Sequence, residues 1–180
     1  MAPSTLSDKG EASVKNPQQK QQKGLGPVGK AITTGSACLT LACTGPQVRP
    51  EPPDEPCPSG AVQAMAKLDI DIGDTKRGLL LGSHTEILSV REGWTHVRIP
   101  SAFKDLPPNA LVKGRLLLGG DRVYGRFTQA QEYEGTRTWP VCMELEDSDG
   151  KRGLELEPGS TADTAKVFNS VVVRAVDRFK

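Results

Sequence analysis

After residue 58 the chain consists mainly of short segments in which apolar and polar residues alternate, separated by Gly, Asp or Pro. Alternation with a period of two is typical of strands that bury one face, and closely spaced turn residues favour antiparallel pairing. The pattern predicts a hairpin over residues 85–99 that turns at Glu92-Gly93, with Val97 and Ile99 on one face.

The longest alternating segment, residues 110–131, predicts a second hairpin that turns at residues 119–121. Residues 141–146 alternate again and are expected to add a further strand. Gly114 and Gly125 interrupt the strands of the second hairpin, and glycines inside strands are typical of bulges or barrel corners.

The two ends of this region differ from its middle. Ser59 is a candidate N-cap for a short helix over residues 60–68. Its apolar side chains fall on one stripe, formed by Val62, Met65, Ala66 and Leu68. The run KVFNSVVVRAVDRF, residues 166–179, is rich in β-branched residues and predicts one long closing strand.

About seven short strands at regular spacing, with Gly or Asp at the turns, are typical of small antiparallel β-domains. We therefore predict a mainly β fold, a single compact antiparallel barrel or sandwich with one short N-terminal helix.

The composition divides the chain into four parts. Residues 1–30 carry five Lys and no Arg among polar residues, and are predicted to be a disordered polar extension. Residues 31–43 carry no charge and resemble a signal peptide, whereas residues 44–58 hold six prolines and predict an extended linker. Residues 59–180 are expected to form the β-rich globular domain.

A phosphate-binding loop is suggested by Gly24, Gly29 and Lys30, which fit G-x-x-x-x-G-K. Ala31 stands where that loop needs Ser or Thr for magnesium, and the preceding NPQQKQQK is not a strand. We therefore expect no nucleotide site.

A lipobox is suggested by L-T-L-A-C, residues 39–43, in which Ala42 precedes the cysteine. Cleavage after Ala42 would leave Cys43 as a lipidated N-terminus. The polar extension ahead of it is too long for a signal peptide, and a start of translation at Val28 would give an ordinary length. The alternative is a disordered tail whose cysteines are there by chance.

The chain has four cysteines, Cys38, Cys43, Cys57 and Cys142. Cleavage at the lipobox would leave Cys57 and Cys142 as an even pair in an oxidising compartment, where a disulfide is expected. The alternative is a buried Cys142 and a free Cys57.

Charge and motifs exclude several functional classes. The formal net charge is +1 and Lys and Arg form no long run, so we expect no nucleic-acid partner. His84 and His96 are the only histidines, no C-x-x-C occurs, and neither a metal site nor a cofactor is expected. No G-x-S-x-G elbow is present, and we predict that the protein is not an enzyme.

A set of Arg and aromatic residues on the predicted strands is a candidate binding face, for a glycan, a peptide or a partner strand. Its members are Arg115, Arg122, Tyr124, Arg126, Tyr133, Arg137 and Trp139. The alternative is a solvated charged surface with ordinary cross-strand pairs.

Over nearly all of residues 56–180 the chain resembles a family of short secreted proteins from myxobacteria. The similarity lies in PCPSGAVQAMAKLDIDIGD, VREGW, KGRLLLGGDRVYGRFTQAQ, WPVCMELEDSDGKRGLE and KVFNSVVVRAVDRF. Members carry a lipoprotein-like N-terminus, and some carry a serine/threonine kinase name. The chain lacks the V-A-I-K, H-R-D and D-F-G motifs that kinase activity needs. A more distant similarity, to the periplasmic barrel of type IV secretion, concerns the fold alone.

The sequence and this resemblance together predict a non-enzymatic lipoprotein of the cell envelope. Its partners would be the membrane, through the lipid on Cys43, and a protein or glycan bound by the β-domain. The alternative is a cytosolic accessory or regulatory domain associated with a serine/threonine kinase system.

Overall fold

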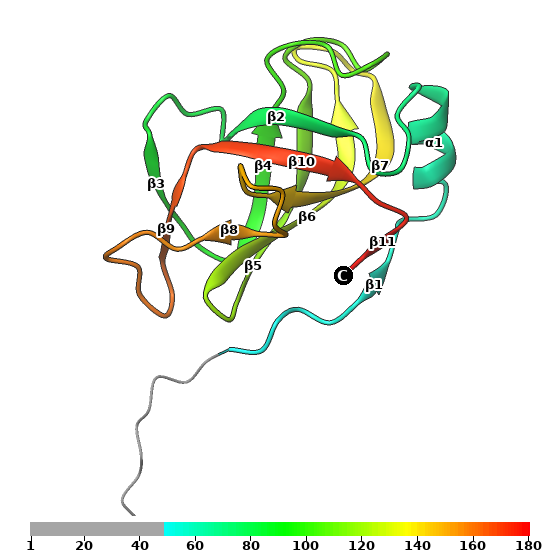
Figure 1. The fold of residues 1–180 in the computed structure, drawn as a ribbon. Helices are drawn as coiled ribbons and strands as arrows, with labels where there is room; N and C mark the ends of the chain where they lie inside the picture. The colour runs from blue at the N-terminus through cyan, green and yellow to red at the C-terminus, as the bar shows by residue number, and fades with distance from the viewer. Residues whose placement is uncertain (1–48) are drawn as a thin grey trace, which may run out of the picture. The chain divides into compact units, whose positions relative to one another are not determined.

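The computed structural model describes residues 49–180 (Figure 1). The predictions for residues 1–30 and 31–43, including lipidation of Cys43, lie outside the described residues, as do residues 44–48.

The fold is mainly β and is built around a closed, six-stranded antiparallel barrel. The ring runs in the order β5-β4-β2-β10-β7-β6, and pairing of β5 with β6 closes it. The barrel strands are β2 (Thr75–Leu80), β4 (Gly93–Arg98), β5 (Leu111–Gly119), β6 (Arg122–Gln131), β7 (Thr138–Glu146) and β10 (Ser170–Ala175). The predicted class is confirmed, and of its two architectures the chain adopts the barrel.

Shorter elements lie around this ring. The strand β8 (Leu154–Glu155) extends the sheet beside β6, and two-stranded ribbons join β1 (Glu55–Pro56) to β11 (Arg178–Phe179) and β3 (Ile87–Val90) to β9 (Ala165–Phe168). Figure 1 shows β1 and β11 side by side, close to the C-terminus. The helix α1 (Ala61–Lys67) packs against β7.

The predicted hairpin over residues 110–131 is confirmed as β5 and β6, which turn at Gly120-Asp121. A bulge shifts the register between Lys113 and Gly114. A Cβ on Gly114 would lie 2.0 Å from the backbone oxygen of Arg126, so only glycine lets the two strands approach this closely.

Alternate residues of the barrel strands fill a single core. Among the fully buried side chains are Val97 and Val112 on neighbouring strands, Phe127 on β6, and Met143 and Leu145 on β7. Full burial of one such side chain contributes about 1.5–3 kcal/mol, so the core favours a single strand register.

The helix differs from its prediction at the N-terminus. Gly60, with φ 78°, occupies the cap position, and no side chain caps the helix, so the assignment of Ser59 as N-cap was wrong. Met65 and Leu68 are buried as expected, but Ala66 is exposed and Ala61 takes its place in the core.

The predicted hairpin over residues 85–99 and the predicted single strand over residues 166–179 were also wrong. The strands within residues 85–99 do not form a hairpin, because β3 pairs with β9 and β4 pairs with β2 and β5. The run 166–179 is strand-forming as predicted, but it is divided into β9, β10 and β11, which pair with different partners. The first division falls at Asn169, whose side-chain amide donates to the backbone oxygen of Ser83 at 2.9 Å.

Candidate functional site

The expected disulfide between Cys57 and Cys142 is present. It joins the residues that follow β1 to the middle of β7, across 85 positions of sequence. The helix lies against the same place, because the backbone N–H of Cys142 donates to Sδ of Met65 at 3.4 Å. The bridge therefore fixes the start of the domain on the barrel wall.

The residues before the bridge, 49–56, lie against the barrel, and we call them the strap. Glu55 and Pro56 pair with β11, and the backbone N–H of Gly120 donates to the backbone oxygen of Arg49 at 2.6 Å. A Cβ on Gly119 would lie 2.7 Å from the backbone oxygen of Pro50. The described part of the predicted linker is therefore attached to the domain.

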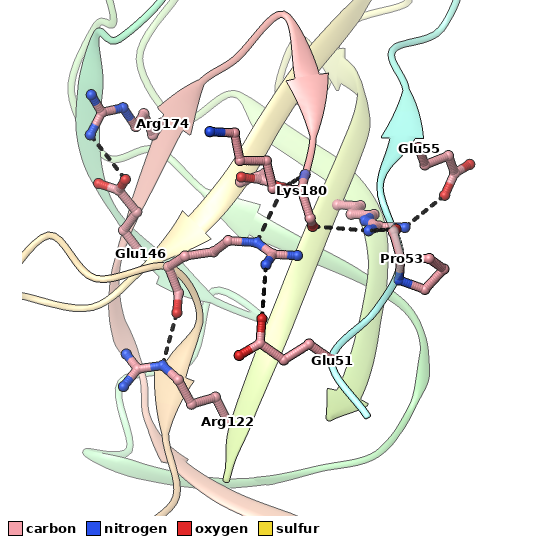
Figure 2. A network of polar contacts seen from close by, with 10 residues as sticks. Glu51, Pro53, Glu55, Arg122, Glu146, Arg174 and Lys180 are labelled. Carbon is pink, nitrogen blue, oxygen red and sulfur yellow. Dashed lines mark hydrogen bonds and ion pairs between the residues drawn. The ribbon is translucent and has the colours of Figure 1, made fainter. Parts of the chain in front are cut away.

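Arg126 is the main attachment point of the strap. Its side chain is 5% exposed and its Nη1 donates to Glu55 at 2.9 Å. Its Nη2 donates to the backbone oxygens of Pro53 and Lys180, the latter at 3.0 Å. Figure 2 shows Pro53 and Glu55 of the strap together with Lys180 at the other end of the domain. One guanidinium thus holds both ends of the domain on the outer face of β6.

Two further arginines contact acidic residues of the strap. Arg115 lies 3.3 Å from Glu55, and Arg152 lies 3.5 Å from Glu51. The guanidinium of Arg152 also stacks over the ring of Tyr124, 4.6 Å from its centroid. Burial of Tyr124, and next the carboxylate of Glu51, raise the pKa of the phenol. The outer face of β6 is thus covered by a complementary segment of the same chain.

This arrangement corrects the candidate binding face. Tyr124 and Arg126 are buried under the strap instead of being exposed. Arg122 is largely buried too, and donates to Asp147 and to the backbone oxygen of Gly153.

Arg115 lies on β5 and contacts the strap, whereas Tyr133, Arg137 and Trp139 lie in or beside the turn between β6 and β7. Arg137 pairs with Glu132 at 2.8 Å and stacks over Trp139, and Tyr133 is exposed. The structure therefore does not gather the seven residues into one open surface. Sequence alternation placed residues on the correct side of a strand, but it carried no information about what covers that side.

Two buried carboxylates on β7 were not identified from the sequence. Glu144 accepts from the backbone N–H of Lys180 at 2.7 Å and lies 3.5 Å from Nε of Arg152. Glu146 lies 3.1 Å from Arg174, and Figure 2 shows this pair. Burial raises the pKa of the Glu144 carboxyl. Both carboxylates are bonded to groups of the protein itself: Glu144 holds the backbone of Lys180, and Glu146 pairs with Arg174 on β10.

A groove with a volume of about 330 Å³ lies between β8 and β10. Its residues are Arg77, Asp147, Ser148, Asp149, Leu154, Glu155, Glu157, Phe168, Ser170, Val171 and Val172. None of these residues belongs to the candidate face predicted from the sequence. The one sequence signal for this groove is the acidic residues at every second position in DSDG, residues 147–150, and LELE, residues 154–157.

The groove opens because two strands separate. The ladder between β7 and β10 ends at Glu146 and Val172, after which the chain turns back over residues 147–150. β8 then follows β7 along the same edge of β6, and in this sheet it pairs with β6 alone. β8 and the first residues of β10, Ser170 and Val171, therefore border the groove without being paired to each other.

The charge of the groove is mainly negative. Within residues 49–180, Asp149, Glu155 and Glu157 form no ion pair, and Arg77 is the one basic residue of the lining. Asp147 is neutralised by Arg122. Although burial acts to raise the pKa of Asp147, the backbone N–H of Lys151 and the Arg122 guanidinium hold that pKa below its ordinary value.

Other candidate chemistry is dispersed. Burial and the nearby Lys113 lower the pKa of His96, and His84 contacts Arg98 at 3.4 Å. Within residues 49–180 no three His, Cys, Asp or Glu side chains come together in a way that could hold a metal ion. The described helix is also too short to cross a membrane.

No model of a known protein family matches the chain. Comparison with curated proteins likewise gives no match. The function is therefore inferred from the residues and their geometry.

Proposed function

We propose that the protein is a lipid-anchored, non-enzymatic binding protein of the cell envelope, in which the barrel holds a partner in the groove between β8 and β10. The disulfide between Cys57 and Cys142 is the main support for placing the protein in the cell envelope. Structural disulfides form and persist in oxidising compartments and are rare in the cytosol.

The layout of the chain supports the anchor. The lipobox at residues 39–43 is followed directly by proline-rich sequence, and the strap then leads to the bridged Cys57. The resemblance to secreted, lipoprotein-like proteins of myxobacteria points the same way. The alternative, a cytosolic accessory domain of a kinase system, would have to keep a bridged pair in a reducing compartment.

The groove supports a binding role. It combines an apolar floor, formed by Leu154, Val171 and Val172, with carboxylates at its rim. A concave site with an apolar floor and a few polar groups is the usual form of a binding site. Neither histidine of the chain lines it.

Metabolic labelling with a palmitate analogue in the native host tests the anchor. The wild-type protein and a Cys38→Ser variant should incorporate the label and sediment with membranes, whereas a Cys43→Ser variant should do neither. Label on the Cys43→Ser variant would contradict lipidation at this residue. Unlabelled protein in the soluble fraction, with free thiols at Cys57 and Cys142, would favour the cytosolic alternative.

A further inference from the structure

We propose that the groove binds an extended segment of a second protein as an added β-strand, and that this segment carries Lys or Arg side chains. This inference rests on the proposed binding role of the groove, and it does not depend on the lipid anchor.

The backbone argument begins with the two borders of the groove. Strands that lack a partner on one side present free N–H and C=O groups, which pair readily with another extended chain. The β10 residues Ser170 and Val171 pair with β2 on one side, and their ladder with β7 begins only at Val172. On the opposite border, Leu154 and Glu155 pair with β6 only. An extended segment can therefore bond to one or both borders, as in other cases of strand addition.

The side-chain argument concerns alternation. Successive residues of an added strand point to opposite faces, so every second side chain enters the groove or its rim. Phe168 is 46% exposed beside the groove, and its cross-strand partner Ile87 is 43% exposed. Of this pair Phe168 lines the groove, and together with Val172 it offers apolar contact to side chains of the partner that point inward.

The charge argument selects the other residues of the partner. Glu155 and Glu157 lie two positions apart on the β8 side, and neither forms an ion pair within the described residues. Asp149 adds a third carboxylate at the turn that follows β7. A partner with basic residues spaced by two complements this border, whereas an acidic partner would be repelled from it.

Synthetic peptides test the proposal by fluorescence polarisation, with the full chain in its disulfide-bonded form. The probe is fluorescein-TKVKVKVT-amide, in which Lys and Val alternate. The same peptide with Glu in place of Lys tests the charge requirement. A third peptide, with the backbone nitrogens of two valines methylated, keeps the side chains but removes donors that strand pairing needs.

The Lys peptide should bind, the Glu peptide should not, and the methylated peptide should bind at least about tenfold more weakly. A Glu155→Gln/Glu157→Gln variant should weaken binding by about two- to fivefold for each charge removed. A Glu134→Gln variant, changed at an exposed position in the turn between β6 and β7, should bind as the wild type does. Circular dichroism of each variant shows whether the barrel is intact.

Three outcomes would overturn the inference. One is the absence of Lys-peptide binding at about 1 mM, the concentration of a very weak complex. Another is equal binding of the methylated peptide, and a third is binding that the Glu155→Gln/Glu157→Gln variant leaves unchanged. If a glucosamine hexamer binds the groove instead and depends on Glu155 and Glu157, strand addition is wrong but the proposed binding role stands. The palmitate experiment tests the anchor separately.

Discussion

Reduction of the bridge between Cys57 and Cys142 should destabilise the domain strongly without unfolding it. The strap keeps its other attachments after reduction, since Arg126 still bonds to Glu55 and β1 still pairs with β11. Cys142 is fully buried in the core and Cys57 packs against it, so the reduced sulfurs stay in contact with the same neighbours. The main effect therefore falls on the unfolded chain.

The expected magnitude follows from the size of the loop. The bridge joins residues 85 positions apart. Closing such a loop removes about 15 cal/mol/K of conformational entropy from the unfolded chain, which corresponds to about 4.5 kcal/mol near room temperature. Domains of this kind are stable by about 5–15 kcal/mol in total, so the reduced form should be folded but only marginally stable.

Urea unfolding followed by circular dichroism measures the effect. The oxidised and reduced wild-type protein are compared with a Cys57→Ala/Cys142→Ala variant, which should respond to urea in the same way with and without reductant. For an m-value of about 2 kcal/mol per molar urea, the unfolding midpoint of the wild type should fall by about 2 M on reduction.

A fall in unfolding free energy of less than about 1 kcal/mol would refute this reasoning, because it would mean that the bridge does not restrict the unfolded chain. Alkylation of Cys57 or Cys142 in the native protein before reduction would refute it as well. That second result would also remove the main support for an oxidising compartment.

Three further predictions concern single residues. Arg126→Met should lower the unfolding free energy by about 2–4 kcal/mol, because it removes the hydrogen bonds that a buried guanidinium donates to Glu55, Pro53 and Lys180. Arg115→Met, which removes a side chain that is 47% exposed, should lower it by less than about 1 kcal/mol; equal losses in urea melts would contradict the role given to Arg126. Gly114→Ala should lower the unfolding free energy by about 2–4 kcal/mol because the new Cβ meets the backbone of β6, whereas Gly120→Ala, in open space at φ 55°, should lower it by about 1 kcal/mol. Calorimetry compares the two variants, and the reverse order of stability would contradict the close approach of the strands. Burial raises the pKa of the Glu144 carboxyl, so its contribution to the unfolding free energy is present at low pH and is lost as the pH rises above the ordinary pKa of 4.5. The unfolding free energy of a Glu144→Gln variant should therefore rise relative to that of the wild type between about pH 4 and pH 7, and a difference in urea melts that does not change with pH would show that Glu144 does not titrate in this way.

Local signals accounted for much of the fold. The hairpin of β5 and β6 has strong alternation and a glycine-rich turn, so its two strands and the place of its turn were accessible from short-range sequence. The bulge at Gly114 could be predicted because glycine weakens the interior of a strand and is typical of positions where strands bend or approach closely. The cysteine pair could be proposed by counting, although its proximity depended on the fold.

Long-range pairing accounted for what was missed. β3 lies next to β4 in sequence, but its partner β9 lies near the other end of the domain. A local pattern of apolar and polar residues does not predict which distant strand a given strand pairs with. The strap had the same effect on the candidate site. Arg126 has the composition of an exposed binding residue, and only the path of residues 49–56 shows that its ligand is part of the same chain.

The place of β10 in the ring has a consequence for how the chain folds. Residues 170–175 fill the position between β2 and β7, so the barrel cannot close before these residues are available. Until then β2 and β7 each present an open edge to other chains. Pairing over such sequence distances is slow, because the loop must close before contacts form. The hairpin of β5 and β6 can therefore form early from local contacts, whereas closure of the ring must wait until β10 has been synthesised.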